Sequence, residues 1–445
     1  MNKDSISPDN RTESLYRRGR ELIPGGTQLL SKRPEMYAPE LWPAYYKTAK
    51  GITVTDLDDR LYQDFSTMGI GACLLGYGCD AVDEAVIARI RGGSTSTLNA
   101  PEEVELAERL VALHPWSQQA RFTRAGGEAM SVAVRIARAV TGRSVVAVCG
   151  YHGWSDWYLA ANLTGGDALG GHLLPGLEPT GVPSELTGTN FTFRYNQPAE
   201  LEALVALHGG NLAAIVMEPM RHDLPKDGFL EKVRAVADRL GAVLIFDEIT
   251  NGFRANFGGS HLRLGANPDI AVFAKALGNG YPIGAVIGRA EVMDGAQRAF
   301  ISSTSWTEGT GPAAAIATLK EMERLQPWSH ISAVAGKVMQ GWRELAELHE
   351  LPFTVSGSGN LCALHFGTDT DANATRTLFT QEMLTLGYLA GAGFYPCAAH
   401  TLSAVDDYLS AVDKVFGFIA MAVTTGGVRA KLKHREADQG FRRLT

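Results

Sequence analysis

The strongest constraint on the fold of this chain is an alternation of short apolar segments with longer amphipathic ones through its middle. These segments are four to six residues long and most are nearly continuous apolar runs, which is typical of strands buried on both faces of a sheet. They are residues 120–123, 145–149, 213–218, 243–247 and 270–274. Helical periodicity lies beside or between them, at residues 81–90, 103–113, 128–140 and 230–240. This order predicts an α/β fold with a mostly parallel sheet covered by helices on both faces.

The regions on either side of this alternating region predict a second, smaller domain. Residues 51–65 follow a Pro-Gly-Gly turn and alternate enough to predict a small hairpin. Residues 153–183 are rich in Gly, Pro, Thr and Leu without a period, which predicts a long loop near the site. From about residue 332, helical and strand patterns indicate an α+β unit. We expect an N-terminal segment that packs with the small domain, a large domain and a C-terminal small domain, at residues 1–65, 66–320 and 321–445.

Composition excludes several classes of partner. Charged residues make up 20% of the chain and the net charge is -7, so there is no basic surface for nucleic acid. The polar first ten residues do not resemble a secretory signal, and no apolar run approaches the length of about 20 residues that a membrane span needs. The five cysteines are scattered without a CxxC pair, which predicts no metal site or disulfide framework and favours the cytoplasm.

Two glycine-containing segments follow predicted strands, at the edge of the sheet where ligands bind. Gly126 and Gly127 precede a helix, and the free backbone N–H groups at a helix start favour a phosphate. A plain glycine turn explains them equally well, because the segment matches no complete phosphate-binding motif. Tyr151 and His152 follow the next strand, and an aromatic ring there suits one face of a flat ligand. Taken singly, each is more often a packing or structural residue.

Two carboxylates end apolar strands that a helix connects. Glu218 ends one strand and Asp247 the next, so both are expected on the same rim of the sheet, from adjacent strands. A carboxylate there is costly unless it is paired. A protonated pyridine nitrogen is one such partner, because an aspartate keeps that ring cationic and able to accept electrons. The alternative for Asp247 is a helix N-cap.

A lysine follows the strand at residues 270–274. Near-burial and neighbouring cations can lower the pKa of such an amine, so that Lys275 could condense with an aldehyde. Alone, it could be a surface lysine whose stem covers apolar side chains. The other motifs change this interpretation, because Lys275 occurs together with the glycine turn, the aromatic residue and an aspartate 28 positions upstream. Together they indicate pyridoxal 5'-phosphate bound as a Schiff base on Lys275.

The order of these motifs resembles the class III, or subgroup II, aminotransferases of PLP fold type I, nearest the glutamate-1-semialdehyde 2,1-aminomutase branch. The motifs that carry the resemblance are GGEA, YHGW, DEITNGFR, FAKALGNGYPIGA and TEGTGP. The resemblance extends over nearly the whole chain. It implies an α/β fold with a mostly parallel seven-stranded sheet in the large domain and a smaller α+β domain, and a homodimer.

The resemblance also implies roles for the residues that hold the cofactor ring. Lys275 forms the Schiff base, Asp247 holds the pyridine nitrogen, and Tyr151 stacks on one ring face. Ile249 packs on the opposite face, and Glu218 orients the loop beside the ring. His152, next to Tyr151, is expected among the cofactor-binding residues. Lys275, Asp247 and Tyr151 are the expected catalytic residues.

For the phosphate, the resemblance implies backbone N–H groups of Gly126 and Gly127, and Thr307 reaching across to the partner subunit's cofactor. This chain has Ala125 before the two glycines where many relatives have Ser-Gly-Thr, so two hydroxyl contacts are missing. Lys32 or Arg33 is a candidate for binding a substrate carboxylate, and a solvated basic pair explains them equally well.

These expectations favour an aminotransferase that moves an amino group from an amine or amino-acid donor to a keto or aldehyde acceptor by a ping-pong mechanism. An intramolecular 2,1-aminomutase is the alternative, but residues 390–394 contain no glutamate where the aminomutases usually carry one. From other classes, a non-catalytic PLP-binding protein and an NAD-dependent oxidoreductase remain. The latter lacks a GxGxxG motif with an acidic residue about 20 positions later.

Overall fold

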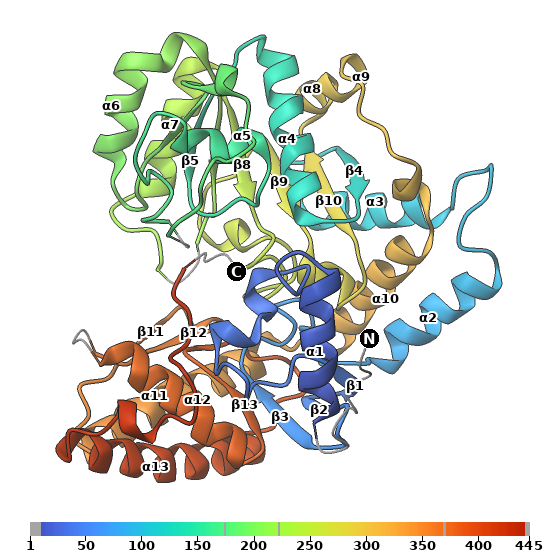
Figure 1. Cartoon of the computed structure of the whole chain (residues 1–445). Helices are drawn as coiled ribbons and strands as arrows, with labels where there is room; N and C mark the ends of the chain where they lie inside the picture. Colours follow the sequence, from blue (N-terminus) through green and yellow to red (C-terminus); the bar gives the residue numbers. More distant parts are fainter. Residues whose placement is uncertain (1–9, 173–174, 221–222, 368–370, 441–445) are drawn as a thin grey trace. The chain divides into compact units, whose positions relative to one another are not determined.

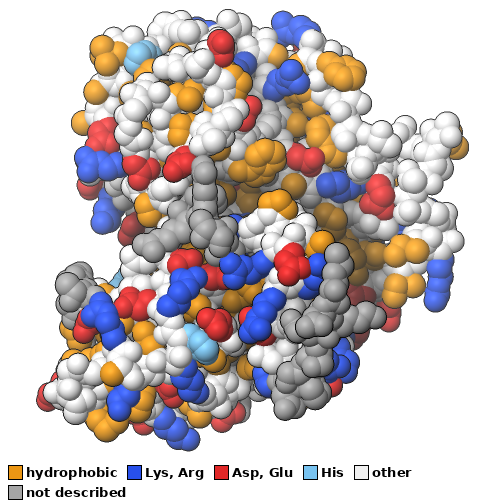
Figure 2. All heavy atoms as spheres, in the orientation of Figure 1, with side chains coloured by type: hydrophobic (Ala, Val, Ile, Leu, Met, Phe, Trp, Pro, Cys, Tyr) orange, Lys and Arg blue, Asp and Glu red, His pale blue; other side chains and the backbone are white. Residues whose placement is uncertain are grey.

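The computed structural model describes residues 10–172, 175–220, 223–367 and 371–440 (Figure 1). The chain forms two compact units, a larger one over Asp80–Trp328 and a smaller one from Met1–Cys79 and Ser329–Thr445. The domain boundaries expected after residues 65 and 320 stay a prediction. Within the described ranges, no helix has the length and apolar character needed to cross a membrane. On the face seen in Figure 2, basic and acidic side chains are interspersed over both units.

The larger unit is built on a seven-stranded sheet in the order β4-β10-β9-β8-β7-β5-β6. Its strands are β4 (Gln119–Thr123), β5 (Val145–Cys149), β6 (Asn190–Thr192), β7 (Leu212–Met217), β8 (Val243–Asp247), β9 (Ile270–Phe273) and β10 (Gly284–Gly288). The run from β6 to β9 is parallel, whereas β10 is antiparallel to both β4 and β9. The predicted α/β fold with a mostly parallel seven-stranded sheet is confirmed.

Burial on both faces explains the continuous apolar runs of the central strands. Every residue of β5, β7, β8 and β9 is buried. Successive side chains of a strand point to opposite faces. In β5, Val146 and Val148 therefore join the core under α4 (Gly126–Thr141), whereas Val145 and Ala147 join the core under α7 (Phe229–Leu240). The sheet is thus a rigid layer between two helical layers.

The larger unit has further helices, which are α2 (Asp80–Arg91), α3 (Glu102–Leu113), α5 (Asp156–Leu159), α6 (Pro198–His208), α8 (Ala290–Met293), α9 (Gly295–Arg298) and α10 (Thr310–Leu325). Of these, α2 lies beside α10 and extends away from the sheet (Figure 1). Helix α5 lies inside the segment expected to be a long loop, where Trp157 and Tyr158 are buried. Residues 173–174 of that segment lie outside the described residues.

The smaller unit joins the two ends of the chain. Its strands are β1 (Tyr46–Lys50), β2 (Thr53–Asp56), β3 (Leu61–Phe65), β11 (Thr354–Gly357), β12 (Cys362–His365), β13 (Tyr388–Ala390) and β14 (Gly393–Phe394), and its helices are α1 (Arg11–Leu22), α11 (Trp328–Leu348), α12 (Ala372–Thr385) and α13 (Leu402–Thr424). The expected hairpin is present as β2 and β3, and β3 also pairs in parallel with β13. Phe65 stacks on Tyr408 with ring centroids 4.2 Å apart.

A buried hydrogen-bond network fixes the segment that follows β8. The fully buried Glu248 carboxylate accepts hydrogen bonds from His261 Nδ1 at 2.7 Å and from Ser260 Oγ at 2.8 Å. His261 Nε2 accepts one from Trp116 Nε1 at 2.9 Å. Burial opposes ionisation of Glu248, but the hydrogen bonds from His261 outweigh it and bring the pKa of Glu248 below its ordinary value. The network therefore favours an ionised Glu248 beside Asp247.

His114 extends this network as a neutral side chain. Its Nδ1 donates to Leu110 O at 2.7 Å, and its Nε2 accepts from Gly259 N at 2.9 Å. One nitrogen donates and the other accepts, which is the pattern of a neutral imidazole. Burial lowers the pKa of His114 to about 4. The folded protein therefore resists protonation at this position, whereas the unfolded chain takes up a proton near its ordinary pKa of about 6.5.

We predict that His114 makes folding pH-dependent between about pH 6.5 and pH 4. In that window the unfolded state binds more protons, so stability falls as the pH falls. His114→Gln removes the titrating group, and the wild type should lose about 2 kcal/mol more than the variant between pH 7.5 and pH 5. Urea unfolding at both pH values measures the difference, with the exposed His365→Gln as control. Equal losses in wild type and His114→Gln would contradict the assignment.

Candidate active site

The parallel register brings the predicted site residues to one rim of the sheet. Met217 of β7 pairs with Cys149 of β5 and with Phe246 of β8, and Asp247 pairs with Val272 of β9. The segments that follow these strand ends therefore start side by side. They carry Tyr151, His152, Glu218, Asp247, Ile249 and Lys275.

The buried carboxylate of Asp247 is held from two sides. Its Oδ2 lies 2.8 Å from His152 Nδ1, and its Oδ1 accepts a hydrogen bond from Ile249 N at 3.0 Å. The other ring nitrogen of His152 lies 3.2 Å from Cys149 O. His152 is buried as well. It therefore contacts the carboxylate and the end of β5, a role closer to positioning Asp247 than to contacting a ligand directly.

Lys275 follows β9 in an uncommon backbone conformation. Its φ is 48°, in the left-handed region that non-glycine residues rarely occupy. Such a conformation costs on the order of 1 kcal/mol or more and persists where the surrounding structure determines it. The Nζ atom donates a hydrogen bond to Thr250 Oγ1 at 3.0 Å. The fold thus directs the amine of Lys275 toward the segment that carries Asp247.

Sequence reasoning did not identify Thr250 as part of this arrangement. Thr250 is three residues after Asp247 and is buried. Its signal was weak, because a threonine in a loop after a strand is common. Its hydroxyl could be assigned only once the structure brought it to Lys275, 25 positions away in the chain.

The start of α4 is closely packed against the segment after β8. A Cβ on Gly126 would lie 2.9 Å from Ile249 Cδ1, so even alanine would crowd that side chain. The Glu128 carboxylate accepts from the backbone nitrogens of Arg124 at 3.0 Å and Ala125 at 3.1 Å. The next N–H groups of a helix start have no partner within the helix. Gly126 and Gly127 therefore allow an anion to approach the backbone closely.

Tyr151 and Glu218 meet around a glycine turn. Gly150 has a φ of 115°, which favours glycine. A Cβ on it would lie 3.0 Å from Glu218 Oε2, so this carboxylate packs directly against the turn. The half-buried Tyr151 lies edge-on to Tyr158, with ring centroids 5.9 Å apart. Glu218 therefore contacts the loop that presents Tyr151.

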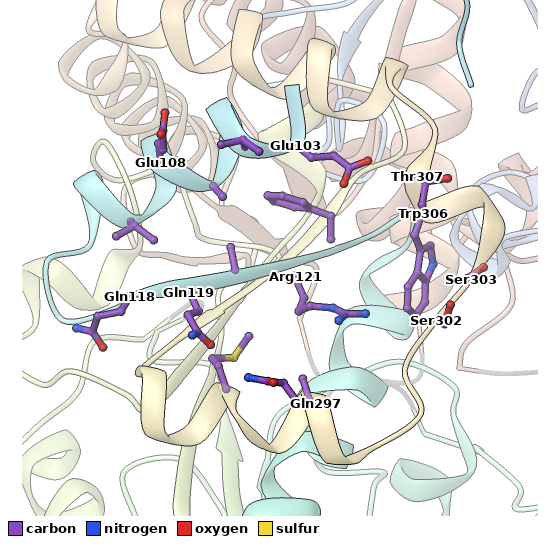
Figure 3. A pocket seen from close by; sticks show the side chains of 17 residues that line it. Glu103, Glu108, Gln118, Gln119, Arg121, Gln297, Ser302, Ser303, Trp306 and Thr307 are labelled. Carbon is purple, nitrogen blue, oxygen red and sulfur yellow. The ribbon is translucent and has the colours of Figure 1, made fainter. Parts of the chain in front are cut away.

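Thr307 lies elsewhere on the larger unit. It is exposed, and its Oγ1 donates to Thr304 O at 2.9 Å. Figure 3 shows it with Trp306 and Ser303 at one end of a surface pocket that α3 and β4 also line. Trp306 Nε1 contacts Glu128 Oε2 at 3.3 Å. The turn that holds Thr307 therefore touches the first turn of α4.

The two candidate carboxylate-binding cations lie in the smaller unit. Lys32 is exposed, in a short turn over Leu30–Lys32. Arg33 is half-buried, and its guanidinium packs over Gly25. The choice between them stays a prediction. In the ranges that the structure describes, no group of three or more His, Cys, Asp or Glu side chains could hold a metal ion.

Comparison with known proteins gives a consistent result. Residues 36–409 match the family model described as aminotransferase class-III. The chain is 30% identical over 425 residues to a 3-aminobutyryl-CoA aminotransferase from Cloacimonas acidaminovorans, covering 91% of this chain and 98% of that protein. It is 31% identical over 365 residues to a glutamate-1-semialdehyde 2,1-aminomutase from Francisella philomiragia, covering 80% and 82%.

A solved structure is similar over almost the whole chain. The PLP-bound FumI protein of Sphingopyxis sp. MTA144 superimposes with a TM-score of 0.84 at 27% identity, covering 94% of this chain and 98% of that one. The shared architecture is PLP fold type I. These findings support neither a nicotinamide-dependent oxidoreductase nor a non-catalytic binding protein.

We predict that His152 and Asp247 stabilise the fold as a pair. His152→Phe leaves the buried Oδ2 of Asp247 without this donor and should cost about 1–3 kcal/mol of unfolding free energy. In an Asp247→Asn background the same substitution should cost less, because the buried charge is gone. Urea unfolding of the two single variants and the double variant measures the coupling. Additive effects would show that the pair does not interact.

Proposed function

We propose that Lys275 carries the cofactor of this chain. The chain belongs to the class-III aminotransferase family and is a pyridoxal 5'-phosphate-dependent enzyme. The activity of such an enzyme is transfer of an amino group from an amine or amino-acid donor to a keto or aldehyde acceptor. The observation that best supports Lys275 is its position after β9, beside β8 with Asp247 at its end. The amine and the carboxylate thus start from adjacent parallel strands on one rim.

The described residues fit the cofactor. Asp247 offers a buried carboxylate for a ring nitrogen, and the Gly126–Gly127 turn offers backbone N–H groups that no side chain of its own covers. When bound, pyridoxal 5'-phosphate supplies an aldehyde that condenses with primary amines and a ring that accepts electrons. Tyr151 and Ile249 would cover the two faces of that ring. Glu218 would hold the turn at Gly150 and so keep Tyr151 in place.

In the proposed chemistry, Lys275 moves a proton after the donor amine has displaced it. Its Nζ would act as the general base for the proton on the donor carbon that bears the nitrogen, and as the general acid when that proton is returned. Thr250 holds the amine by its hydroxyl, and Asp247 keeps the ring nitrogen protonated. In the second half of the reaction, Lys275 would make the same two proton transfers in the reverse order, with the acceptor carbonyl compound in place of the keto product. General acid-base transfer of this kind contributes on the order of a hundred- to ten-thousand-fold to the rate.

We further propose that the working unit is a homodimer in which Thr307 reaches the phosphate of the partner subunit's cofactor. The exposure of Thr307 supports this, because its side chain is open to a second chain. A cytoplasmic location, expected from the scattered cysteines, is part of the same proposal.

We predict that Lys275→Ala abolishes covalent attachment of the cofactor. The variant should lack the Schiff-base absorbance at roughly 420 nm, and its turnover should fall by at least about a hundred-fold. Its circular dichroism spectrum should stay that of the wild type. The matched control is Lys320→Ala, on the surface of α10, where the lysine pairs with Glu105. A Lys275→Ala protein that keeps the absorbance and normal turnover would overturn the proposal.

The similarity to the Francisella aminomutase makes an intramolecular reaction the second candidate. We predict that the protein needs two substrates. An amine or amino-acid donor given alone should release about one keto product per subunit and stop, until an acceptor is added. Glutamate 1-semialdehyde given alone should not be isomerised catalytically. Repeated conversion of that compound to its isomer without an added donor would favour the aminomutase instead.

A further inference from the structure

The glycine turn at the start of α4 lacks the hydroxyl groups that commonly bind a phosphate. Residues 125–127 are Ala-Gly-Gly, so they can offer only backbone N–H groups. The nearest hydroxyl of the first helical turns is Ser131 Oγ, which donates to Gly127 O at 2.9 Å and lies 2.8 Å from Ser155 Oγ. That hydroxyl is occupied within the helix and with its neighbour. Any side-chain donor to a phosphate at this turn therefore comes from another segment.

The indole of Trp154 lies beside the position that a side chain at residue 127 would occupy. A Cβ built on Gly127 would meet Trp154 Nε1 at 3.4 Å and Trp154 Cδ1 at 3.7 Å. The polar edge of the indole, rather than its benzene ring, thus faces the turn. Trp154 is 75% exposed, so this edge is open to a ligand.

The backbone conformation at Gly153 brings the segment that carries Trp154 close to Gly127. Gly153 has a φ of 104°, and a Cβ on it would lie 3.4 Å from Gly127 Cα. The segment after β5 therefore packs directly on the start of α4. The same short segment carries Tyr151, the proposed ring-stacking residue, and Trp154 three positions later.

We propose that Trp154 Nε1–H donates a hydrogen bond to the phosphate group of pyridoxal 5'-phosphate, in the place of a hydroxyl at residue 127. This inference rests on the proposed cofactor site at Lys275. An indole N–H suits this role because it only donates, so it has no lone pair to repel a phosphate dianion. Trp154 is then a cofactor-binding residue, and the turn needs no hydroxyl of its own.

The test compares pyridoxal 5'-phosphate with pyridoxal, which has the same ring and aldehyde but no phosphate. Dissociation constants are measured on the apoenzymes by equilibrium dialysis. Trp154→Phe should weaken binding of pyridoxal 5'-phosphate by roughly 10- to 100-fold, the range for a hydrogen bond to a charged group. Binding of pyridoxal should stay within about two-fold. Equal binding of pyridoxal 5'-phosphate by wild type and Trp154→Phe would overturn the inference, as would an equal loss for both ligands.

A second variant supplies the missing hydroxyl. Gly127 has no positive φ, and its Cβ would make only ordinary contact with Trp154, so Gly127→Ser is compatible with the fold. The double variant Gly127→Ser with Trp154→Phe should recover most of the lost affinity for pyridoxal 5'-phosphate. Failure of the serine to restore any affinity would count against a phosphate contact at this position.

The control is Trp157→Phe, three residues further along the same segment. Trp157 is buried, and its Nε1 has no hydrogen-bond partner among the described residues. Its substitution should leave the preference for the phosphorylated ligand unchanged, and a loss of that preference would contradict the assignment to Trp154.

Different results would refute the two proposals. Attachment of the cofactor to another lysine in the wild type would refute the proposed site at Lys275. Unchanged binding by Trp154→Phe would refute only the contact between the indole and the phosphate.

Discussion

The parallel pairing of β5, β7, β8 and β9 is the constraint on which the site depends. Each strand contributes one segment to the same rim, and the register pairs Asp247 with Val272, three residues before Lys275. Because side chains alternate along a strand, a slip of one residue would turn Asp247 to the opposite face. The two apolar cores above and below the sheet prevent such a slip. The register therefore keeps the segment that carries Lys275 beside the end of β8, where Asp247 lies.

The two consecutive carboxylates at the end of β8, Asp247 and Glu248, have different hydrogen-bond partners. Asp247 contacts His152 at the rim, whereas Glu248 contacts His261 within a network that extends to His114. A buried charge is costly unless hydrogen bonds compensate for it. The Glu248 network anchors the segment after β8, whereas Asp247 is the carboxylate that we propose for the cofactor ring nitrogen. Strain is present nearby, at the left-handed backbone of Lys275, as is common at functional sites.

Much of the scaffold could be predicted because its signal is local. The limits of β5 and β8 match the predicted strands, since each is an uninterrupted apolar run. Strand β10 was missed, because its sequence GAVIG is short and begins and ends with glycine. The contact between His152 and Asp247 joins residues 95 positions apart, and no local pattern indicates it. The approach of Trp154 to Gly127 could not be predicted either, because it depends on how two loops pack.

The central claim is that one lysine bonds covalently to the cofactor. The most direct measurement is borohydride reduction of the protein loaded with pyridoxal 5'-phosphate, followed by digestion and mass spectrometry of the peptides. The account predicts a single pyridoxyl-modified peptide that contains Lys275. A label on any other lysine, with Lys275 unmodified, would contradict it.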